Sequence, residues 1–475
     1  MNLLGIIFCM VAVVLFCFVY KNDRKYLSLY VLAVVLFIPK INILTLTTGA
    51  AAGLRTDDLI IFMFVLVLLV EKFETIKDVF TSKVFMIYVL YVIASVFSFV
   101  LGIATGQTFN FKLSLFSLIR KVEYFCFIFV GYDFIYHNKG DYQTPFNKLL
   151  YAFTTFTGVV SVLQYASIIG AYRASSYEIL GVATGTFNGP YEIGGFFAIL
   201  FAYYFYNFIK NKERGTNLYY SMVSILIVLL SKSRSSLVII FAIIIVMCLL
   251  YCSKKYKIII SVSGAIVAIV FMMAIYYNLL PILDRFATLD ISAAIDAIKY
   301  YWKNVNYEQY ADIIKSGRGV ELYAYGYGDF SFNVRMFKWI AVLKTLPKNL
   351  LFGYGFGSNT TLDGSYVKLL VENGLIGTLL FISALVYTIQ YRKNNNIGKF
   401  LVWILIIQFM GAIFIDILEA SKIMEFLWVL VGVSLYEIDE DKNSQKNNIE
   451  WLIQEQKIKN KFIKKEIKKL WKELF

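Results

Sequence analysis

Two stretches, SKSRSSLVII at residues 231–240 and LLFGYGFGSNTTLDGSYVKLLVENGLIG at residues 350–377, decide the kind of fold this chain can adopt. Both stand among hydrophobic runs that are long enough to cross a bilayer. The first places Arg234 at the mouth of an apolar segment, where a charge without a partner or water is costly. The second is a glycine-rich turn followed by a polar and then an apolar run with helical character. The two stretches therefore predict a membrane protein with polar groups at the ends of its helices.

The composition of the whole chain also indicates a membrane protein. Hydrophobic residues make up 59% of the 475 residues and the mean hydropathy is +0.66, whereas a soluble domain is close to half apolar. The five cysteines lie in or beside apolar runs, which is typical of small buried side chains and not of a disulfide framework. The chain has a single histidine, His137, which excludes a metal site built from several histidines. We expect neither a metal nor a cofactor.

Apolar runs of about 15–20 residues predict an all-α polytopic protein with twelve to thirteen transmembrane helices. The first 25 residues lack a basic n-region and a small-residue cleavage site, so they predict a retained first span and not a signal peptide. The predicted spans are residues 3–20, 26–44, 58–70, 83–101, 119–136, 147–170, 191–209, 217–231, 236–252, 257–280, 371–390, 400–418 and 422–437.

Short basic loops predict the orientation, because loops rich in Lys and Arg stay cytoplasmic. If the thirteen spans alternate, the four segments with three basic residues each fall on one side, together with the basic end of the chain; these segments are residues 21–25, 210–214, 253–257 and 392–399. The prediction is therefore a membrane domain over residues 1–437 and a cytoplasmic tail over 438–475. The membrane domain includes one large extracytoplasmic loop at about residues 281–370.

The extracytoplasmic loop and the tail differ in character. The loop is rich in aromatic residues, and the pattern ISAAIDAIKYYWKNV at residues 291–305 predicts short helices within it. The tail has apolar residues at helical spacing among many lysines, which is typical of an amphipathic helix on an anionic membrane surface. A disordered solubilising tail is the alternative. The net charge of +14 comes largely from the tail and the inner loops, so it indicates membrane topology and not nucleic-acid binding.

Charged residues gather near the predicted outward ends of the spans, which predicts a polar cavity that opens outward. For any single residue, interfacial snorkelling or helix capping is the alternative explanation. Asp416 and Glu419 are three residues apart, so we expect them to share one face of a helix. The gathered residues are Arg55, Asp57, Asp58, Arg120, Glu123, Arg173, Glu192, Lys232, Arg234, Arg285, Arg318, Arg335, Asp363, Asp416, Glu419 and Lys422.

Several short motifs occur in a characteristic order along the second half of the chain. They are Arg173 followed by the loop GTFNGPYEIGG (185–195), Ser233-Arg234-Ser235 at the opening of a span, Arg335 shortly before Trp339, and a Pro…Phe-Gly-x-Gly element from Pro347 to Gly355. In this order they resemble the O-antigen polymerase/ligase superfamily, membrane enzymes that join lipid-linked glycans on the outer face of the cytoplasmic membrane. The first loop departs from the family pattern, because Gly189 stands between Asn188 and Pro190.

The resemblance implies a polyprenyl-pyrophosphate-linked glycan as substrate and roles for particular residues. Arginine suits a pyrophosphate because its guanidinium binds phosphate oxygens in a bidentate manner. A carboxylate would accept the proton of the attacking hydroxyl. Membrane lipids, a chain-length regulator and a flippase are the other partners considered. The candidate substrate-binding residues are Arg120, Arg173, Arg234, Arg335 and Tyr366, and the candidate bases, in order of preference, are Asp363, Glu192 and Asp416.

One departure separates the two branches of the superfamily. The ligase branch carries His-Asn-x-Tyr-Leu ahead of a Glu-x-Gly element, and here the corresponding residues run from Asp363 to Val367, ahead of Glu372-Asn373-Gly374. In having an aspartate in place of this histidine, the chain resembles the repeat-unit polymerases. We therefore expect polymerisation of undecaprenyl-pyrophosphate-linked repeat units in the bacterial cytoplasmic membrane, with Asp363 as base or as the cap of a helix that begins near Ser365. A glycan ligase and a flippase or other transporter are the alternatives.

Overall fold

The computed structural model describes residues 3–45, 53–106, 111–170, 182–210, 213–251, 291–306, 308, 330–344, 346–355, 362, 364–413 and 415–436. This part contains fifteen α-helices and one two-stranded hairpin, so the all-α prediction is confirmed. The α-helices are α1 (Leu3–Asn22), α2 (Leu27–Phe37), α3 (Thr56–Val70), α4 (Lys77–Thr81), α5 (Lys83–Ala104), α6 (Phe111–His137), α7 (Gln143–Tyr165), α9 (Pro190–Ile209), α10 (Arg214–Leu230), α11 (Arg234–Tyr251), α14 (Ile291–Asn304), α16 (Phe330–Leu343), α17 (Ser365–Tyr387), α18 (Asn396–Gly411) and α19 (Ser421–Leu435). Short 3-10 helices are η1 (Arg24–Tyr26), η2 (Glu74–Ile76), η5 (Leu346–Asn349) and η6 (Thr388–Lys393).

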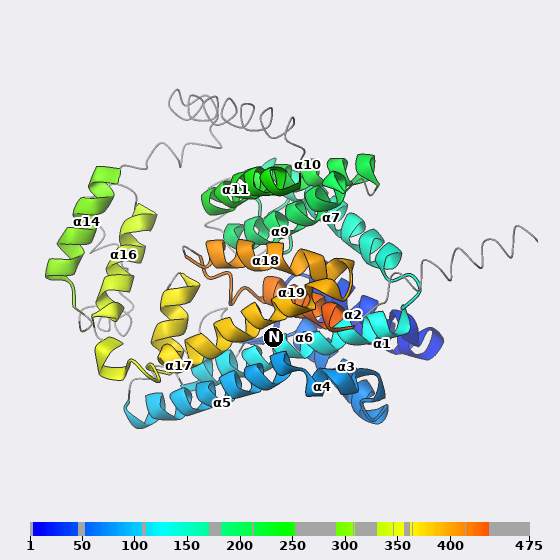
Figure 1. The fold of residues 1–475 in the computed structure, drawn as a ribbon, viewed down its shortest axis with the longest axis horizontal. Helices are drawn as coiled ribbons and strands as arrows, with labels where there is room; N and C mark the ends of the chain where they lie inside the picture. The colour runs from blue at the N-terminus through cyan, green and yellow to red at the C-terminus, as the bar shows by residue number, and fades with distance from the viewer. Residues whose placement is uncertain are drawn as a thin grey trace, which may run out of the picture.

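Long helices lie side by side in one bundle (Figure 1). Six helices of the described part are long and apolar enough to cross a membrane, namely α1, α5, α7, α9, α11 and the helix that starts with α17. The shorter helices α10 and α18 are also apolar. These features fit a multi-pass membrane protein, as the apolar runs predicted. The predicted span at 257–280 and the predicted tail at 438–475 lie outside the described residues.

The bundle has two ends that differ in what they carry. At one, here called the hairpin end, α3 begins directly after the β-hairpin, Arg120 of α6 donates to the Gly53 carbonyl, and Glu425 of α19 pairs with Lys40. At the other, the basic-loop end, η1 contacts the last turns of α3 and α6, and Asn394 donates to the Ser434 carbonyl at the end of α19. Lys210 lies over the ring of Tyr251 there. The basic segments 21–25, 210–214 and 392–399 thus share one end, as predicted, and residues 253–257 lie outside the described part.

The second predicted span, residues 26–44, is wrong in its second half. α2 ends at Phe37 because Pro39 disfavours a helical residue before it, and Ile38 is extended. Strand β1 (Asn42–Thr45) then pairs antiparallel with β2 (Gly53–Arg55), with an irregularity between Asn42 and Leu44. The hairpin returns the chain to the start of α3. It therefore keeps the Lys40–Thr45 segment at the hairpin end.

Helices α6 and α19 form the closest helix pair, because each presents a glycine to the other. A Cβ on Gly131 would lie 1.9 Å from the Val429 carbonyl oxygen, and a Cβ on Gly432 would lie 2.0 Å from that of Ile128. Both helices start at the hairpin end, so residues about two turns before these glycines face each other as well. This contact places Glu123 of α6 opposite Glu425 of α19.

A glycine-rich loop is built into a break in α17. At Gly374 the backbone has φ 63° and leaves the helical path. The Tyr354 and Gly355 amides donate to the carbonyls of Val371 and Glu372 at 2.7 and 3.0 Å. Beyond the break, the Leu375 amide donates to the Leu350 carbonyl at 2.8 Å. The glycine motif before α17 and the Glu-x-Gly element within it therefore satisfy one another's backbone groups.

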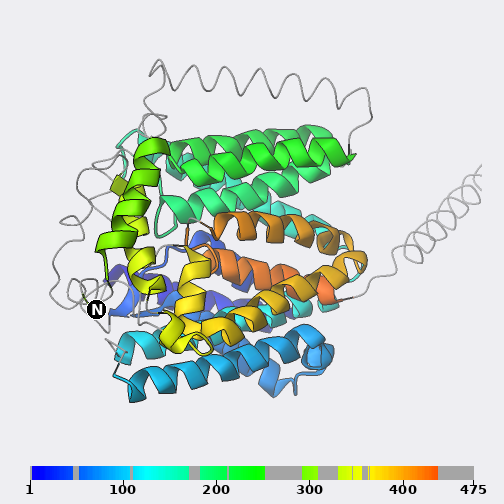
Figure 2. The same ribbon diagram turned by 60° about the vertical axis from the view of Figure 1, so that its left-hand side comes forward.

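Helices α14 and α16 stand across the other helices at the hairpin end (Figure 2). They pack through a small apolar core in which the rings of Tyr301 and Phe337 lie 6.0 Å apart. A Cβ on Gly364, just before α17, would lie 2.6 Å from the Trp339 ring of α16. α14 thus confirms the prediction of a short helix at residues 291–305. α16 rests against the start of α17.

Candidate functional site

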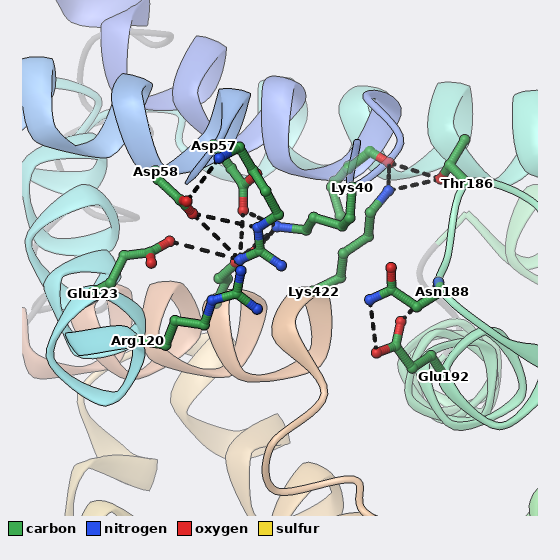
Figure 3. Close-up of polar contacts among 12 residues, drawn as sticks. Lys40, Asp57, Asp58, Arg120, Glu123, Thr186, Asn188, Glu192 and Lys422 are labelled. Atoms are coloured by element: carbon green, nitrogen blue, oxygen red, sulfur yellow. Dashed lines mark hydrogen bonds and ion pairs between the residues drawn. The ribbon is translucent and has the colours of Figure 1, made fainter. Parts of the chain in front are cut away.

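Charged side chains from five segments meet at the hairpin end (Figure 3). They come from the turn after α2, from β2, from the first turn of α3, from α6 and from α19. We call six of them the Lys40 cluster: Lys40, Arg55, Asp57, Asp58, Glu123 and Glu425. The segments are brought together by the hairpin and by the α6–α19 contact. Four of the charges that the sequence placed at one membrane level, Arg55, Asp57, Asp58 and Glu123, are therefore also close in space.

The Lys40 ammonium is the centre of this cluster. Its side chain is 2% exposed, and Nζ donates to Glu425 Oε1 at 2.7 Å and to Asp57. Arg55 Nη2 lies 3.2 Å from Asp57 Oδ2 and 3.9 Å from both Glu123 Oε1 and Glu425 Oε1. Buried charges are tolerated when they are paired in this way. The cluster combines two cations with four carboxylates.

Three carboxylates of the cluster are close enough to share a cation. Oxygen atoms of Asp57, Glu123 and Glu425 lie within 4.8 Å of one another. The Lys40 ammonium and the Arg55 guanidinium already contact these groups. Side-chain cations therefore stand where a metal ion would be expected to bind, and we assign no metal to this cluster.

Lys422 and Arg120 lie at the edge of the Lys40 cluster (Figure 3). Lys422 is fully buried, and its Nζ donates to the Leu36 carbonyl and to Thr186 Oγ1, each at 2.7 Å. Arg120 is half-buried and its Nη2 donates to the Gly53 carbonyl at 3.1 Å. Lys422 thus ties α19 to the loop before α9, and Arg120 ties α6 to the hairpin.

Glu192, a candidate base, lies in the first turn of α9 and is 3% exposed. Its two oxygens accept hydrogen bonds from the backbone and side-chain nitrogens of Asn188, at 3.0 and 3.1 Å. Gly189 is the N-cap residue and Pro190 takes the first helical position, where its missing N–H does no harm. The geometry therefore gives Glu192 a role in ending the loop and starting the helix.

A second group of charges, the Lys368 cluster, lies between α6, α17 and the connection from α18 to α19. It consists of Lys121, Lys368, Asp416 and Glu419. Lys368 Nζ donates to Asp416 Oδ2 at 2.8 Å and also pairs with Glu419, which in turn pairs with Lys121. Asp416 and Glu419 do not share a helix face as predicted, because α18 ends at Gly411 and α19 begins at Ser421. They come together through their shared lysine.

Ser365 holds the α18–α19 connection against the start of α17. Its hydroxyl donates to the Ile415 carbonyl at 3.1 Å and approaches Asp416 Oδ1 at 3.4 Å. The Leu418 amide donates back to the Ser365 hydroxyl at 3.0 Å. Tyr366, a candidate substrate-binding residue, donates its hydroxyl to the Phe409 carbonyl at 3.0 Å. The first turn of α17 therefore fixes the position of Asp416.

The two carboxylates of the connection have different proton affinities. Burial raises the pKa of Asp416 to about 6, and the negative charge of Glu419 acts in the same direction against the attraction of Lys368. Burial also acts to raise the pKa of Glu419, but the ammonium groups of Lys121 and Lys368 outweigh it and hold this pKa at about 2. Neighbouring carboxylates with separated pKa values are typical of acid–base sites. Asp416 can exchange a proton near neutral pH, while Glu419 stays ionised.

Arg234 and Arg335, the two motif arginines within the described part, are both half-buried at the hairpin end. Arg234 is the first residue of α11, and this helix start lies against α9, since a Cβ on Gly194 would be 2.6 Å from Ser236 Oγ. Arg335 lies one turn before Trp339 on α16, so both share one helix face. Trp339 contacts Gly364. Arg335 therefore lies on the face of α16 that packs against the α17 start, and Arg234 lies where the start of α11 meets α9.

Two of the predicted site residues, Arg173 and Asp363, lie outside the described residues. The N-cap residue of α17 is Gly364, with φ 92°. The predicted helix start near Ser365 is confirmed, and the capping position belongs to Gly364 and not to Asp363. The roles of Arg173 and Asp363 stay predictions.

Sequence reasoning missed four charged residues that the structure places in the two clusters: Lys40, Lys121, Lys368 and Glu425. Lys40 was assigned to the interior of the second span and Glu425 to the interior of the last one. A charged residue inside an apolar run is itself a functional signal, because such a charge needs a partner. That signal, applied to each predicted span, would have found Lys40 and Glu425.

His137 lies far from both clusters. It is the last residue of α6, at the basic-loop end, and its Nδ1 lies 3.0 Å from the Asp133 carbonyl oxygen. Arg120 and His137 are 17 residues apart on α6, which corresponds to about 25 Å along a helix with a rise of 1.5 Å per residue. His137 therefore cannot act on a group bound between the two clusters.

The chain matches one family model, described as O-antigen ligase, over residues 219–382. The match begins in α10 and runs to the second half of α17, so it includes Arg234, Arg335 and Lys368. The Lys40 cluster and the α18–α19 connection lie outside the matched range. No curated protein matches the chain.

Proposed function

We propose that this chain, which matches the O-antigen ligase family model over residues 219–382, is a repeat-unit polymerase of the O-antigen polymerase/ligase superfamily. The superfamily consists of membrane enzymes that act on lipid-linked glycans, and a multi-pass protein of the bacterial inner membrane fits it. The proposed reaction joins oligosaccharide repeat units carried on undecaprenyl pyrophosphate. It would take place at the outer face of the membrane, where the hairpin end would lie if the basic loops are cytoplasmic.

The pyrophosphate would be bound by arginines at the hairpin end. Arg234 opens α11, where the free backbone amides of a helix start also favour an anion. Arg335 lies on the Trp339 face of α16, beside the start of α17. Arg120 and, by the family resemblance, Arg173 would complete the set. Fixed cations that bind the departing pyrophosphate lower the barrier to glycosyl transfer without a metal ion.

Asp416 is the described carboxylate best placed to act as the base. Its position is fixed by Ser365 and Lys368, and its pKa of about 6 suits proton transfer near neutral pH. Glu192 is less suited because both of its oxygens accept hydrogen bonds from Asn188. Asp363, the first choice from the sequence, lies outside the described residues and stays a prediction.

The proposed step conserves atoms and charge as follows. A hydroxyl oxygen at the non-reducing end of a new lipid-linked unit forms a bond to the anomeric carbon of the growing chain. The bond from that carbon to the pyrophosphate oxygen breaks, and its electron pair leaves with undecaprenyl pyrophosphate. The hydroxyl proton passes to the base carboxylate. Arginines that hold the pyrophosphate stabilise the negative charge it gains.

One observation carries the proposal: α16 packs Trp339 against Gly364 at the start of α17, where Ser365 and Lys368 hold Asp416, and Arg335 lies one helical turn before Trp339. A cation for the leaving group and a carboxylate for the proton are thus brought to the same helix start. The polymerase branch is favoured over the ligase branch by Asp363 in the position of the ligase histidine. His137, at the far end of α6, cannot replace that histidine.

A deletion strain tests the proposed function. Without a polymerase, a cell exports and attaches single repeat units, so the deletion should leave one-unit glycans on the surface. Wild-type protein should restore long chains, and Asp416→Asn and Arg335→Ala should not, although both proteins reach the membrane. Long chains that accumulate on undecaprenyl pyrophosphate in the deletion strain would contradict the polymerase and favour the ligase.

A further inference from the structure

A polar cavity of about 620 Å³ opens at the basic-loop end, far from the two charged clusters. It lies between the first turns of α7, α10 and α18 and the last turns of α9. Its lining combines five carboxamides, two lysines, one carboxylate and two tyrosines, from Gln143, Asn147, Asn207, Asn217, Asn396, Lys210, Lys399, Glu213, Tyr203 and Tyr206, with Ile397 and Phe400 as the apolar part. The proposed glycosyl transfer uses none of these residues.

Several of the polar groups are held in place. Tyr203 donates its hydroxyl to Asn147 Oδ1 at 2.6 Å. The Tyr151 hydroxyl, behind the cavity wall, lies 3.1 Å from Glu213 Oε2 and 3.2 Å from Asn217 Oδ1, and either oxygen can accept its single proton. The wall therefore presents oriented amide and carboxylate groups, which suit a ligand with several hydroxyls.

The two lysines lie at the exposed mouth of the cavity. Lys210 Nζ lies 4.5 Å from the centroid of the Tyr251 ring and 6.0 Å from that of Tyr206. Lys399 Nζ donates to Asn396 Oδ1 at 3.2 Å. Both lysines are exposed. Two ammonium groups at the mouth of a polar cavity favour an anionic group there.

An apolar groove continues from the mouth of the cavity. It has a volume of about 490 Å³, runs between α11 and α18, and shares Tyr206 and Lys399 with the cavity. Its other walls are Val246, Leu250, Tyr251, Val402, Trp403 and Ile406. Leu250 is 62% exposed and Val246 is 41% exposed, on a helix apolar enough to span the membrane. The groove therefore faces the hydrocarbon of the bilayer.

We infer that the cavity and groove together bind one acidic glycerophospholipid from the leaflet at the basic-loop end. The phosphate would lie between Lys210 and Lys399, the headgroup hydroxyls would meet the carboxamides and Glu213, and an acyl chain would follow the groove. A polar cavity alone would suit many solutes, but its continuity with a lipid-facing groove selects a molecule with a headgroup and a chain. A leaflet faced by basic loops is also the one that carries acidic lipids in the cell.

Native mass spectrometry of the delipidated full-length protein tests the charged part of the site. With phosphatidylglycerol as probe, we expect one tightly bound lipid, with at least tenfold lower affinity for phosphatidylcholine of the same chains. The double variant Lys210→Gln with Lys399→Gln should lose that preference. Lys83→Gln is the matched control, since Lys83 lies at the same end with its Nζ 5.8 Å from the Tyr387 ring and lines neither cavity nor groove.

A second pair of variants tests the groove. Leu250→Trp should fill it and weaken binding of phosphatidylglycerol about tenfold, whereas Leu90→Trp, on the exposed face of α5, should leave binding unchanged. Glycerol 3-phosphate without acyl chains should compete poorly. Equal affinity for phosphatidylglycerol and phosphatidylcholine, or binding unchanged in both the lysine and the Leu250 variants, would overturn the inference. Full competition by glycerol 3-phosphate would likewise show that the groove contributes nothing.

Discussion

The two ends of the bundle both hold ion pairs with buried carboxylates, but their geometry differs. At the basic-loop end, the Arg24 guanidinium makes two bidentate pairs, at 2.7 Å with both oxygens of Glu71 and at 2.9 Å with both oxygens of Asp133. At the hairpin end, Arg55 lies 3.2–3.9 Å from its carboxylates, and four carboxylates share two cations. Short, saturated, bidentate geometry is what a purely structural pair requires.

This difference in ion-pair geometry indicates which end of the bundle can bind a substrate. The Arg24 pairs join η1 to the ends of α3 and α6, and their donors and acceptors are matched. The hairpin end instead has an acidic surplus in the Lys40 cluster, with Arg120 and Lys422 at its edge (Figure 3). Arg234 and Arg335 at this end are half-buried. We propose that the arginines at this end bind the pyrophosphate of the substrate, since a guanidinium binds phosphate oxygens in a bidentate manner.

The largest expected difference between the ends is their accessibility. In a variant without the natural cysteines, Asn304→Cys on the exposed face of α14 should react with an impermeant thiol reagent in intact cells, and Asn22→Cys should react only after lysis. Asn22 is exposed at the basic-loop end, so a cysteine there should be reactive once the reagent can cross the membrane. The reverse labelling would place the hairpin end inside and would contradict the proposed site.

Arginine replacement should separate the two ends by activity. Arg335→Ala or Arg234→Ala should reduce chain extension about 100-fold or more, since each would remove a donor that meets the leaving group. Lysine should restore little, because a point charge does not reproduce bidentate binding. Chain-length profiles of surface glycan, together with immunoblots of the membrane fraction, measure both effects. Arg214→Ala, an exposed arginine at the basic-loop end, is the control and should be silent.

The two ends should also differ in how much the loss of an arginine destabilises the folded protein. Arg24→Ala should destabilise the protein by about 3 kcal/mol, because it leaves the buried Asp133 carboxylate without its ion pair. Thermal unfolding of the purified protein in detergent should show this loss, whereas Arg335→Ala should unfold near the wild-type temperature. If Arg335→Ala lowered the unfolding temperature as much as Arg24→Ala, Arg335 would be structural and the contrast between the ends would disappear.

The smallest predicted effect is a pH dependence. The pKa of Asp416 is raised to about 6, so its carboxylate is protonated and cannot accept a proton below that pH. Chain extension should fall about tenfold per pH unit below pH 6 and level off above about pH 7. Glu419, with its pKa at about 2, does not titrate in this range. Asp416→Asn should be slow with a flat profile; a wild-type profile flat from pH 5 to 8 would exclude Asp416 as the base.

Much of the fold could be predicted because it depends on local pattern. Apolar runs predicted helices such as α5, α9 and α11, and the aromatic pattern at residues 291–305 predicted α14. The motif positions Arg234 and Arg335 were found because the family resemblance singles them out. The predicted end of α2 was wrong, since a hydropathy run continued past Pro39 into a strand.

The pairing of charges could not be predicted from pattern. Lys40 bonds to Glu425, 385 residues further along the chain, and Lys368 bonds to Asp416, 48 residues away. Such pairs depend on which helices are neighbours, and this follows from packing such as the Gly131–Gly432 contact. The prediction that Asp416 and Glu419 lie close together is correct, but its reason is wrong. They lie close because both pair with Lys368, and they do not share a helix face.

Reconstitution of the purified chain in liposomes tests the polymerase proposal most directly. The liposomes would contain synthetic undecaprenyl-pyrophosphate-linked repeat units and no other enzyme, with EDTA present to remove metal ions. We expect a ladder of lipid-linked glycans that grows by whole repeat units, with one undecaprenyl pyrophosphate released for each new linkage. No ladder, together with transfer of a complete glycan to an added lipid A–core acceptor, would contradict the polymerase and identify a ligase.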